Sequence, residues 1–286
     1  MQKEYAMIRT DFADEMVEEQ MDARGYTHVK KQGKYVSINH IHVHDRENPI
    51  EKEPGDYISI SFSKLQDLEQ RKELIDSIDH CLTKMMENMK KIQKILVVGL
   101  GNRDFVSDAL GPRVAKEILV TAHLYEHADT HHLQGMRNVA VLAPGVMGQT
   151  GLESSVIIER VAAAYQPDLI FAIDALATRQ LQRINRVIQI SNTGIQPGSG
   201  VGNHRRALNE KTVHVPVIAL GVATVTSIYA ILQEAVGEKE EWIRSFYERQ
   251  ADFVVTPKAM DEELLHLSSI IAAGINRTCH PNCGRF

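Results

Sequence analysis

Two aspartates stand where a pair of carboxylates could activate water. Asp108 lies in the segment Gly99–Pro112, which follows the apolar run Ile95–Val98. Asp174 comes directly after a second apolar run, Leu169–Ile173. Carboxylates at the ends of neighbouring parallel strands would raise each other's proton affinity, so that one could act as base and the other as acid. The alternative for each aspartate taken alone is a helix cap.

Two glycine-rich loops could offer backbone amides to a substrate. The first, 143–151, contains Gly145 between a predicted strand and a predicted helix. The second, 194–203, contains the candidate residues Gly198, Ser199 and Gly200. Glycine permits close backbone approach, so such loops could bind an extended peptide or an oxyanion. A tight surface turn explains the first loop adequately, whereas the second is too long and too rich in glycine for a simple turn.

Cofactor sites are less well supported. Gly99 and Gly101 follow a strand, but Asp104 stands where a dinucleotide fingerprint needs its third glycine, and an acid there would repel a pyrophosphate. The histidines form two groups that a metal could use: His40, His42 and His44, and His123, His127, His131 and His132. Neither group has an acid or a cysteine at a familiar ligand spacing, so a solvated polar face is favoured. Cys279–Cys283 resembles half of a metal site without a second half, and we expect a frayed tail there. We therefore expect no metal and no cofactor.

The second half of the chain alternates short apolar runs with helical segments. Strands are expected at Ile95–Leu100, Val139–Leu142, Leu169–Ile173, Val187–Ile190 and Val217–Leu220, and helices at Pro112–Leu119, Leu152–Tyr165, Val225–Val236 and Met260–Asn276. Because these strands are apolar throughout, they predict an α/β fold with a mostly parallel sheet sandwiched by helices. Ligands bind such sheets beyond the carboxyl ends of the strands, where Asp108 and Asp174 are expected.

The N-terminal part is expected to add a hairpin and a helix to this sheet. Tyr35–His44 and Tyr57–Phe62 alternate and are separated by turn residues, which predicts a β-hairpin with a long loop. Apolar residues at spacings of three and four predict a long helix from Ser63 to about Gln93. Residues 1–34 are polar and charge-rich, and nothing there indicates core.

Composition limits the class of protein. The chain has 286 residues, 43% hydrophobic and 24% charged, which excludes collagen-like, low-complexity and wholly disordered chains. With 32 Lys and Arg against 37 Asp and Glu, its net charge of −5 gives no general attraction to nucleic acid or anionic membranes. The 3 cysteines form no disulfide framework, the N-terminus is too charged for a signal peptide, and no apolar run approaches the roughly 20 residues of a membrane span. These features predict a soluble cytoplasmic protein.

Several motifs together resemble the germination protease family of endospore-forming bacteria. They are Gly99–Asn102, Ser107–Pro112, Asp174–Ala177, Gly198–Asn203 and Thr256–Lys258, in the family's order, and the resemblance runs from about Tyr5 to Pro281. It implies a fold similar to the hydrogenase maturation proteases, with two family aspartates at Asp108 and Asp174. The chain departs from the family in being short after Pro112 and before Phe253. It also has His214 where the family usually has Gly, and Ala223 where it usually has Pro.

The resemblance further implies an endopeptidase that begins the degradation of small acid-soluble spore proteins during germination, in the cytoplasm of the spore core. It implies a homotetramer, with no direct nucleic-acid or membrane partner. It also implies a zymogen that trims its own N-terminus, and Thr10–Glu15 resembles the family's cleavage site. We therefore expect cleavage between Asp11 and Phe12, a propeptide of residues 1–11 and a single α/β protease domain of residues 12–286. The alternatives are a metal-binding protease like the hydrogenase maturation enzymes and a catalytically silent α/β binding protein.

Overall fold

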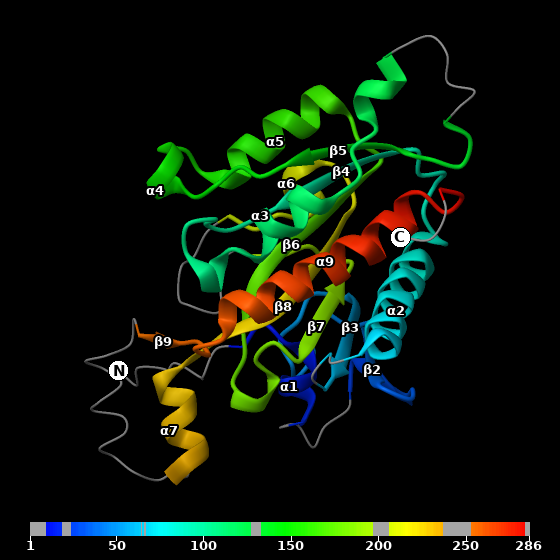
Figure 1. The fold of residues 1–286 in the computed structure, drawn as a ribbon. Coiled ribbons are helices and arrows are strands. Elements are labelled where there is room, and N and C mark those ends of the chain that lie inside the picture. Colours follow the sequence, from blue (N-terminus) through cyan, green and yellow to red (C-terminus); the bar gives the residue numbers. More distant parts are fainter. Residues whose placement is uncertain are drawn as a thin grey trace.

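A nine-stranded sheet forms the centre of the computed structural model, which describes residues 10–18, 24–63, 65, 67–126, 133–196, 206–236 and 253–283 (Figure 1). The strand order is β1-β2-β3-β7-β8-β6-β4-β5, and β9 pairs with β8 off this path. The strands are β1 (Tyr26–Gln32), β2 (Val36–Val43), β3 (Gly55–Phe62), β4 (Lys94–Gly99), β5 (Asn138–Leu142), β6 (Leu169–Ala177), β7 (Val187–Ser191), β8 (Val217–Ser227) and β9 (Val254–Val255).

The parallel part of the sheet is smaller than the sequence predicts. Only the neighbours β5, β4, β6 and β8 are paired in parallel within the described chain, and the remaining pairings are antiparallel. The expectation of a mostly parallel sheet is therefore wrong, although the α/β class is confirmed. Strand β7 is antiparallel to both neighbours, because the segment 178–186 before it is shorter than the roughly twelve or more residues of a parallel crossover.

The hairpin is present, with one more strand than expected. Strands β2 and β3 pair antiparallel across a long loop, and β1 pairs with the outer edge of β2. Most residues of β1 are exposed, so no hydrophobic alternation marked it in the sequence. The first 34 residues also contribute to the interior, contrary to our expectation, because Phe12, Ala13 and Tyr26 are buried.

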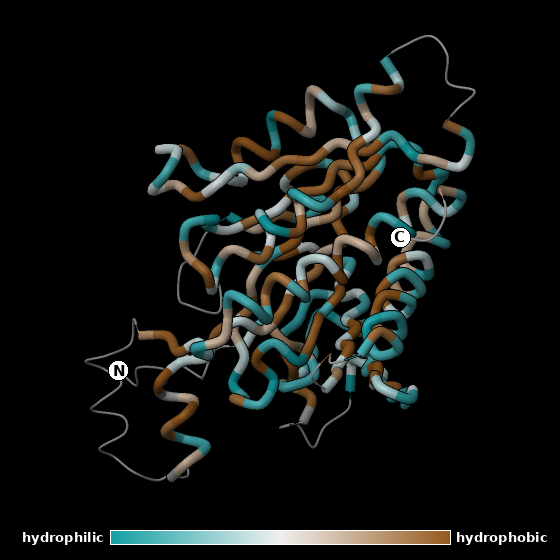
Figure 2. Tube along the Cα trace, viewed as in Figure 1, coloured by the Kyte–Doolittle hydropathy of each residue, from teal (hydrophilic) through white to brown (hydrophobic). Residues whose placement is uncertain are grey.

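Helices cover both faces of the sheet (Figure 1). On one face, α2 (Leu68–Met86), α3 (Leu110–Glu117) and α9 (Met260–Cys279) pack against the main core. On the other face lie α5 (Ser154–Tyr165) and the short α6 (Glu210–Val213). The short helices α1 (Ala13–Glu18) and α4 (Met147–Thr150) and the helix α7 (Ile228–Val236) complete the described α-helices. Figure 2 shows hydrophobic residues along the inner strands and hydrophilic ones along the outer loops.

The end of α9 is not a frayed tail. The helix continues to Cys279, which is fully buried, and His280 is 1% exposed. The Nε2 atom of His280 lies 3.1 Å from the Leu119 carbonyl oxygen. Burial raises the pKa of the Cys279 thiol to about 12, so this cysteine is an uncharged core residue.

Candidate active site

Asp174 lies inside strand β6 rather than after it. The strand runs on to Ala177, and Asp174 is aligned with Gly221 of β8. The Asp174 side chain is on the same face as Ala172, which packs in the core beneath α5 and α6. It is buried, and its Oδ1 accepts a 2.9 Å hydrogen bond from its neighbour Ala175 N. The strand continues past Asp174 and no helix begins there, so Asp174 is not a helix cap.

The Asp108 carboxylate is hydrogen-bonded to the loop that follows β4. It ends a 3₁₀ turn, Val106–Asp108, and its Oδ2 accepts a 2.9 Å hydrogen bond from Asn102 N. Gly101 has a φ of 106°, and an added Cβ would lie 3.0 Å from Asp108 Oδ1, so the carboxylate packs closely against this loop. Asp108 is not a helix cap, because Ala109 is the N-cap of α3 and makes no side-chain cap bond. The helix begins two residues before Pro112, which was predicted at its first position.

Both aspartates border the same loop. Leu100 N donates a 2.8 Å hydrogen bond to the carbonyl of Ile173, the residue before Asp174. Two residues further along the loop, Asn102 N binds the Asp108 carboxylate. The structure therefore brings Asp108 and Asp174 to the carboxyl edge of the neighbouring parallel strands β4 and β6.

The Gly145 loop reaches this edge as well. Gly145 has a φ of 73°, and its carbonyl accepts a 2.8 Å hydrogen bond from Ser154 Oγ. From the same loop, Gln149 Nε2 donates to Asn102 Oδ1 at 2.7 Å and to Asp104 Oδ2 at 2.8 Å. The loop is thus tied to the segment that carries Asp108. The other loop candidates, Gly198, Ser199 and Gly200, lie outside the described residues.

Sequence reasoning missed that the segment around Phe12 is packed onto the sheet. The Phe12 side chain is fully buried among Leu176, Val187 and Ala223. Its neighbour Asp11 donates its backbone N–H to the Ala177 carbonyl at 3.1 Å, while Asp11 Oδ2 accepts from Ala177 N at 2.8 Å. Leu176 is two positions from Asp174 on the same strand, so Phe12 packs on the face that carries Asp174.

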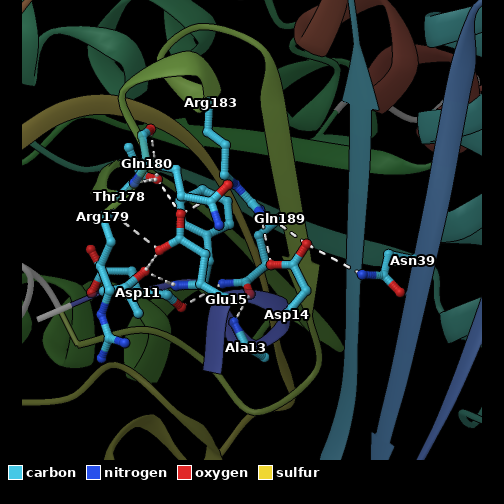
Figure 3. Close-up of polar contacts among 12 residues, drawn as sticks. Asp11, Ala13, Asp14, Glu15, Asn39, Thr178, Arg179, Gln180, Arg183 and Gln189 are labelled. Carbon is cyan, nitrogen blue, oxygen red and sulfur yellow. Dashed lines mark hydrogen bonds and ion pairs between the residues drawn. The ribbon is translucent and has the colours of Figure 1, made fainter. Parts of the chain in front are cut away.

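Two acids in α1 fix this segment from opposite sides (Figure 3). Asp14 accepts hydrogen bonds from Arg183 Nη2 at 2.9 and 3.0 Å. Glu15 accepts from the hydroxyls of Thr10 and Thr178 and from Arg179 N. Their carboxylates are almost fully buried, and the bonds compensate for the lost hydration. No local pattern predicts the contacts with Thr178, Arg179 and Arg183, because these residues belong to the distant segment after β6.

A cavity of about 480 Å³ lies beside the same segment. Its lining includes Asp11, Lys52, Gln189 and Gly221. Gln189 of β7 is aligned with Gly221, which is aligned with Asp174, so the three lie in one row across the sheet. Gly221 adds no side chain between Gln189 and Asp174, and the Leu176 side chain lies over it. The cavity and the candidate catalytic aspartate therefore belong to the same face.

The first histidine group surrounds a carboxylate. His40 Nε2 and His42 Nδ1 lie 2.8 and 2.9 Å from the same oxygen of Asp56. The hydrogen bond with His40, followed by that with His42, lowers the pKa of Asp56 to about 2. Among the described residues, no group of three or more His, Cys, Asp or Glu could hold a metal ion. The second group is only partly described, because His127, His131 and His132 lie outside the described ranges. No helix in the described ranges is long and apolar enough to cross a membrane.

Comparison of the sequence with known proteins points to one family. A family model described as germination protease matches residues 4–238. The germination protease of Clostridium tetani is 36% identical, with 96% of each chain covered. That of Clostridium acetobutylicum is 39% identical over 82% of this chain and 81% of its own. That of Caldanaerobacter subterraneus is 35% identical over 96% of this chain and 94% of its own. With matches of this extent, the chain belongs to the germination protease family and is a peptidase.

Proposed function

We propose that this peptidase is an endopeptidase that begins the degradation of small acid-soluble spore proteins in the spore core. Family membership supports the substrate class, and one observation carries the chemistry. Asp108 and Asp174 border one loop at the carboxyl edge of adjacent parallel strands. One carboxylate would take a proton from water as it attacks the peptide carbonyl, while the other, protonated, assists the carbonyl or the leaving amine. The enzyme would act as a homotetramer, without a cofactor.

The first test is replacement of each aspartate by asparagine. Asn keeps the volume and can still accept the hydrogen bonds from Asn102 N and Ala175 N, so both variants should fold. Neither can take up the proton, so cleavage of a small acid-soluble spore protein should be abolished in each. Residues that act as a unit fail together, so the double variant should lose no more than either single one. Thermal melting of all four proteins is the control for folding.

Other outcomes identify the alternatives. Activity that is lost to a chelator and restored by a divalent ion would indicate the metal-dependent mechanism of a hydrogenase-maturation-like protease. Substantial activity in Asp174→Asn would refute the proposed mechanism. Substantial activity in Asp108→Asn alone would show that the Asp108 carboxylate only holds the loop in place. Asp104 would then be the next candidate for the second catalytic acid. An intact wild-type protein that binds spore proteins without cleaving them would be a catalytically silent binding protein.

The same proposal includes self-processing of a precursor. Cleavage between Asp11 and Phe12 would release the propeptide 1–11 and leave the protease domain 12–286. Phe12 and α1 are packed into the sheet, so the mature N-terminus would stay anchored after the cut. Intact-mass analysis of fully active enzyme should show a chain that begins at Phe12. A fully active chain that still begins at Met1 would contradict this step.

A further inference from the structure

The carbonyl of Asp11 is the acceptor of two side-chain donors from different parts of the fold. Lys52 Nζ, from the loop between β2 and β3, lies 3.2 Å from this oxygen. Gln189 Nε2, from the middle of β7, lies 2.9 Å from it. An amide and an ammonium that converge on one carbonyl oxygen are the donors that would stabilise negative charge there.

We propose that Lys52 and Gln189 form the oxyanion site for self-cleavage of the Asp11–Phe12 bond, and that both are catalytic residues of processing. This inference rests on the proposed cleavage between Asp11 and Phe12. It assigns a role to two residues that no sequence motif marked. Both distances are within or close to the range of protein hydrogen bonds, so a small movement of the oxygen suffices to bind it as an oxyanion.

Gln189 also orients the bond. Its Oε1 accepts a 2.9 Å hydrogen bond from Ala13 N, so one amide group binds the backbone on both sides of Phe12 (Figure 3). The bond is further fixed by the Asp11 contacts with Ala177 and by the buried Phe12 ring. A substrate carbonyl held in this way has already lost the freedom that a bimolecular reaction must remove.

The surroundings fit an attack by water. Asp11, Lys52 and Gln189 line the cavity, and Gly221 lies between Gln189 and Asp174 in the row across the sheet. Water would add to the Asp11 carbonyl carbon, a catalytic carboxylate would take its proton, and the carbonyl oxygen would become the oxyanion. The C–N bond would then break with its electron pair on the Phe12 nitrogen, which takes a proton from the catalytic acid. The products are a carboxyl group on Asp11 and an amine on Phe12.

The pH dependence of self-cleavage can test the role of Lys52. Desolvation lowers the pKa of its ammonium group, while the carboxylates of Asp11, Glu15 and Asp14 raise it and Arg179 lowers it. Self-cleavage should therefore decline on the alkaline side as Lys52 loses its proton, below the pH at which an exposed lysine would do so. In Lys52→Arg, this alkaline decline should disappear because guanidinium keeps its proton.

The experiment follows first-order self-cleavage of the full-length chain by intact mass. Lys52→Met removes the ammonium group, and Gln189→Glu keeps the acceptor for Ala13 N but replaces the donor by a carboxylate. Each should slow self-cleavage by about 10²–10³, the usual loss for one oxyanion donor. Lys211→Met, which removes an exposed lysine paired with Glu53, should cleave at the wild-type rate. Asn39→Ala removes the hydrogen bond that Asn39 donates to Asp14, which helps to hold the same segment, and leaves the contacts of the Asp11 carbonyl in place. This variant should also cleave itself at nearly the wild-type rate.

The outcomes separate this inference from the proposed function. If wild type removes residues 1–11 and Lys52→Met does so at the same rate, the oxyanion site is overturned and processing stands. It is also overturned if Asn39→Ala is slowed as much as Lys52→Met, because Lys52 would then be an anchor. If wild type degrades the spore protein but keeps Met1, processing and the oxyanion site fail together while the peptidase function stands.

Discussion

Asp14 and Arg183 form a buried ion pair whose side chains are 3% and 12% exposed. Nη2 of the guanidinium group donates to both carboxylate oxygens, at 2.9 and 3.0 Å. The same guanidinium group lies 4.8 Å from the centre of the Phe12 ring and 3.3 Å from a Glu15 carboxylate oxygen. One arginine from the segment after β6 thus contacts three side chains of the N-terminal segment. These contacts help to hold the proposed cleavage site on the sheet.

Removing one partner of this pair should be costly. Arg183→Met leaves Asp14 buried without its cation, and we expect the free energy of unfolding to fall by about 3–5 kcal/mol. Adding Asp14→Asn should recover part of that loss, since the uncompensated charge is then gone as well. Urea denaturation measures both. Arg206→Met, in a more exposed pair with Glu159, is the matched control and should hardly change stability. Equal effects of the two arginine substitutions would contradict a stabilising role of the buried pair.

His214 has a backbone conformation that favours glycine. It ends α6 with φ 59° and ψ 24°, the left-handed region, and its side chain is exposed. Glycine adopts this conformation without the steric cost that a Cβ atom brings. We expect His214→Gly to raise the free energy of unfolding by about 0.5–1 kcal/mol without changing proteolysis. Thermal melting measures the gain, and His214→Asn should give an intermediate value. A loss of stability in His214→Gly would show that the imidazole makes a contact worth more than the strain.

Much of the scaffold was predictable because its signals are local. The apolar runs of β4, β5 and β6 were long enough to mark buried strands, and the rule for open α/β sheets placed Asp108 and Asp174 at one edge. The predictions failed where the direction of a strand or the burial of a segment depends on residues far away in the sequence. Strand direction at β7 is set by the length of the preceding connection, which periodicity does not report.

The packing of the N-terminal segment beside the candidate active site could not be predicted from local sequence either. Phe12 is a lone aromatic residue among charges, so its neighbourhood has the composition of a solvated terminus. It is buried because Arg183, Thr178 and Gln189, far away in sequence, provide partners for Asp14, Glu15 and the local backbone. Lys52 likewise stands in a polar loop, and only the fold brings it to the Asp11 carbonyl. One sequence contains no pattern for such contacts.

Because Asp56 is hydrogen-bonded with His40 and His42, the free energy of unfolding should fall as the pH becomes acidic. Hydrogen bonds with His40 and His42 lower the pKa of Asp56 from 3.8 to about 2. A carboxyl group with a lowered pKa stabilises the fold above its unfolded value and loses that contribution as the pH falls through its folded value. Between pH 3.8 and about 2, wild type should therefore lose about 1 kcal/mol more than Asp56→Asn, after allowance for screening by solvent. Melting curves across this range test it, and parallel losses in both proteins would contradict it. His40→Ala should shift the decline toward the usual pKa.

Gly221 should not tolerate an added side chain. It separates Gln189 from Asp174 in the row across β7, β8 and β6, and an added Cβ would overlap the body of the buried Leu176 side chain. Leu176 in turn packs against Phe12, so it can yield only by disturbing the N-terminal segment. We expect Gly221→Ala to lower the free energy of unfolding by about 1–3 kcal/mol. Self-cleavage should slow at temperatures where the variant is still folded, because the carbonyl and the donors no longer align.

The control for this substitution is Gly148→Ala. Gly148 lies in the exposed helix α4, and an added Cβ there meets nothing within 4 Å. Alanine favours helix over glycine by about 1 kcal/mol, so this variant should be as stable as wild type or slightly more stable, and fully active. Urea denaturation and the intact-mass assay are carried out on both variants. If Gly221→Ala were as stable and as active as Gly148→Ala, the close packing of Leu176 over Gly221 would have no part in the reaction. A stable Gly221→Ala that cleaves the spore protein but not itself would place the defect at the Asp11–Phe12 bond alone.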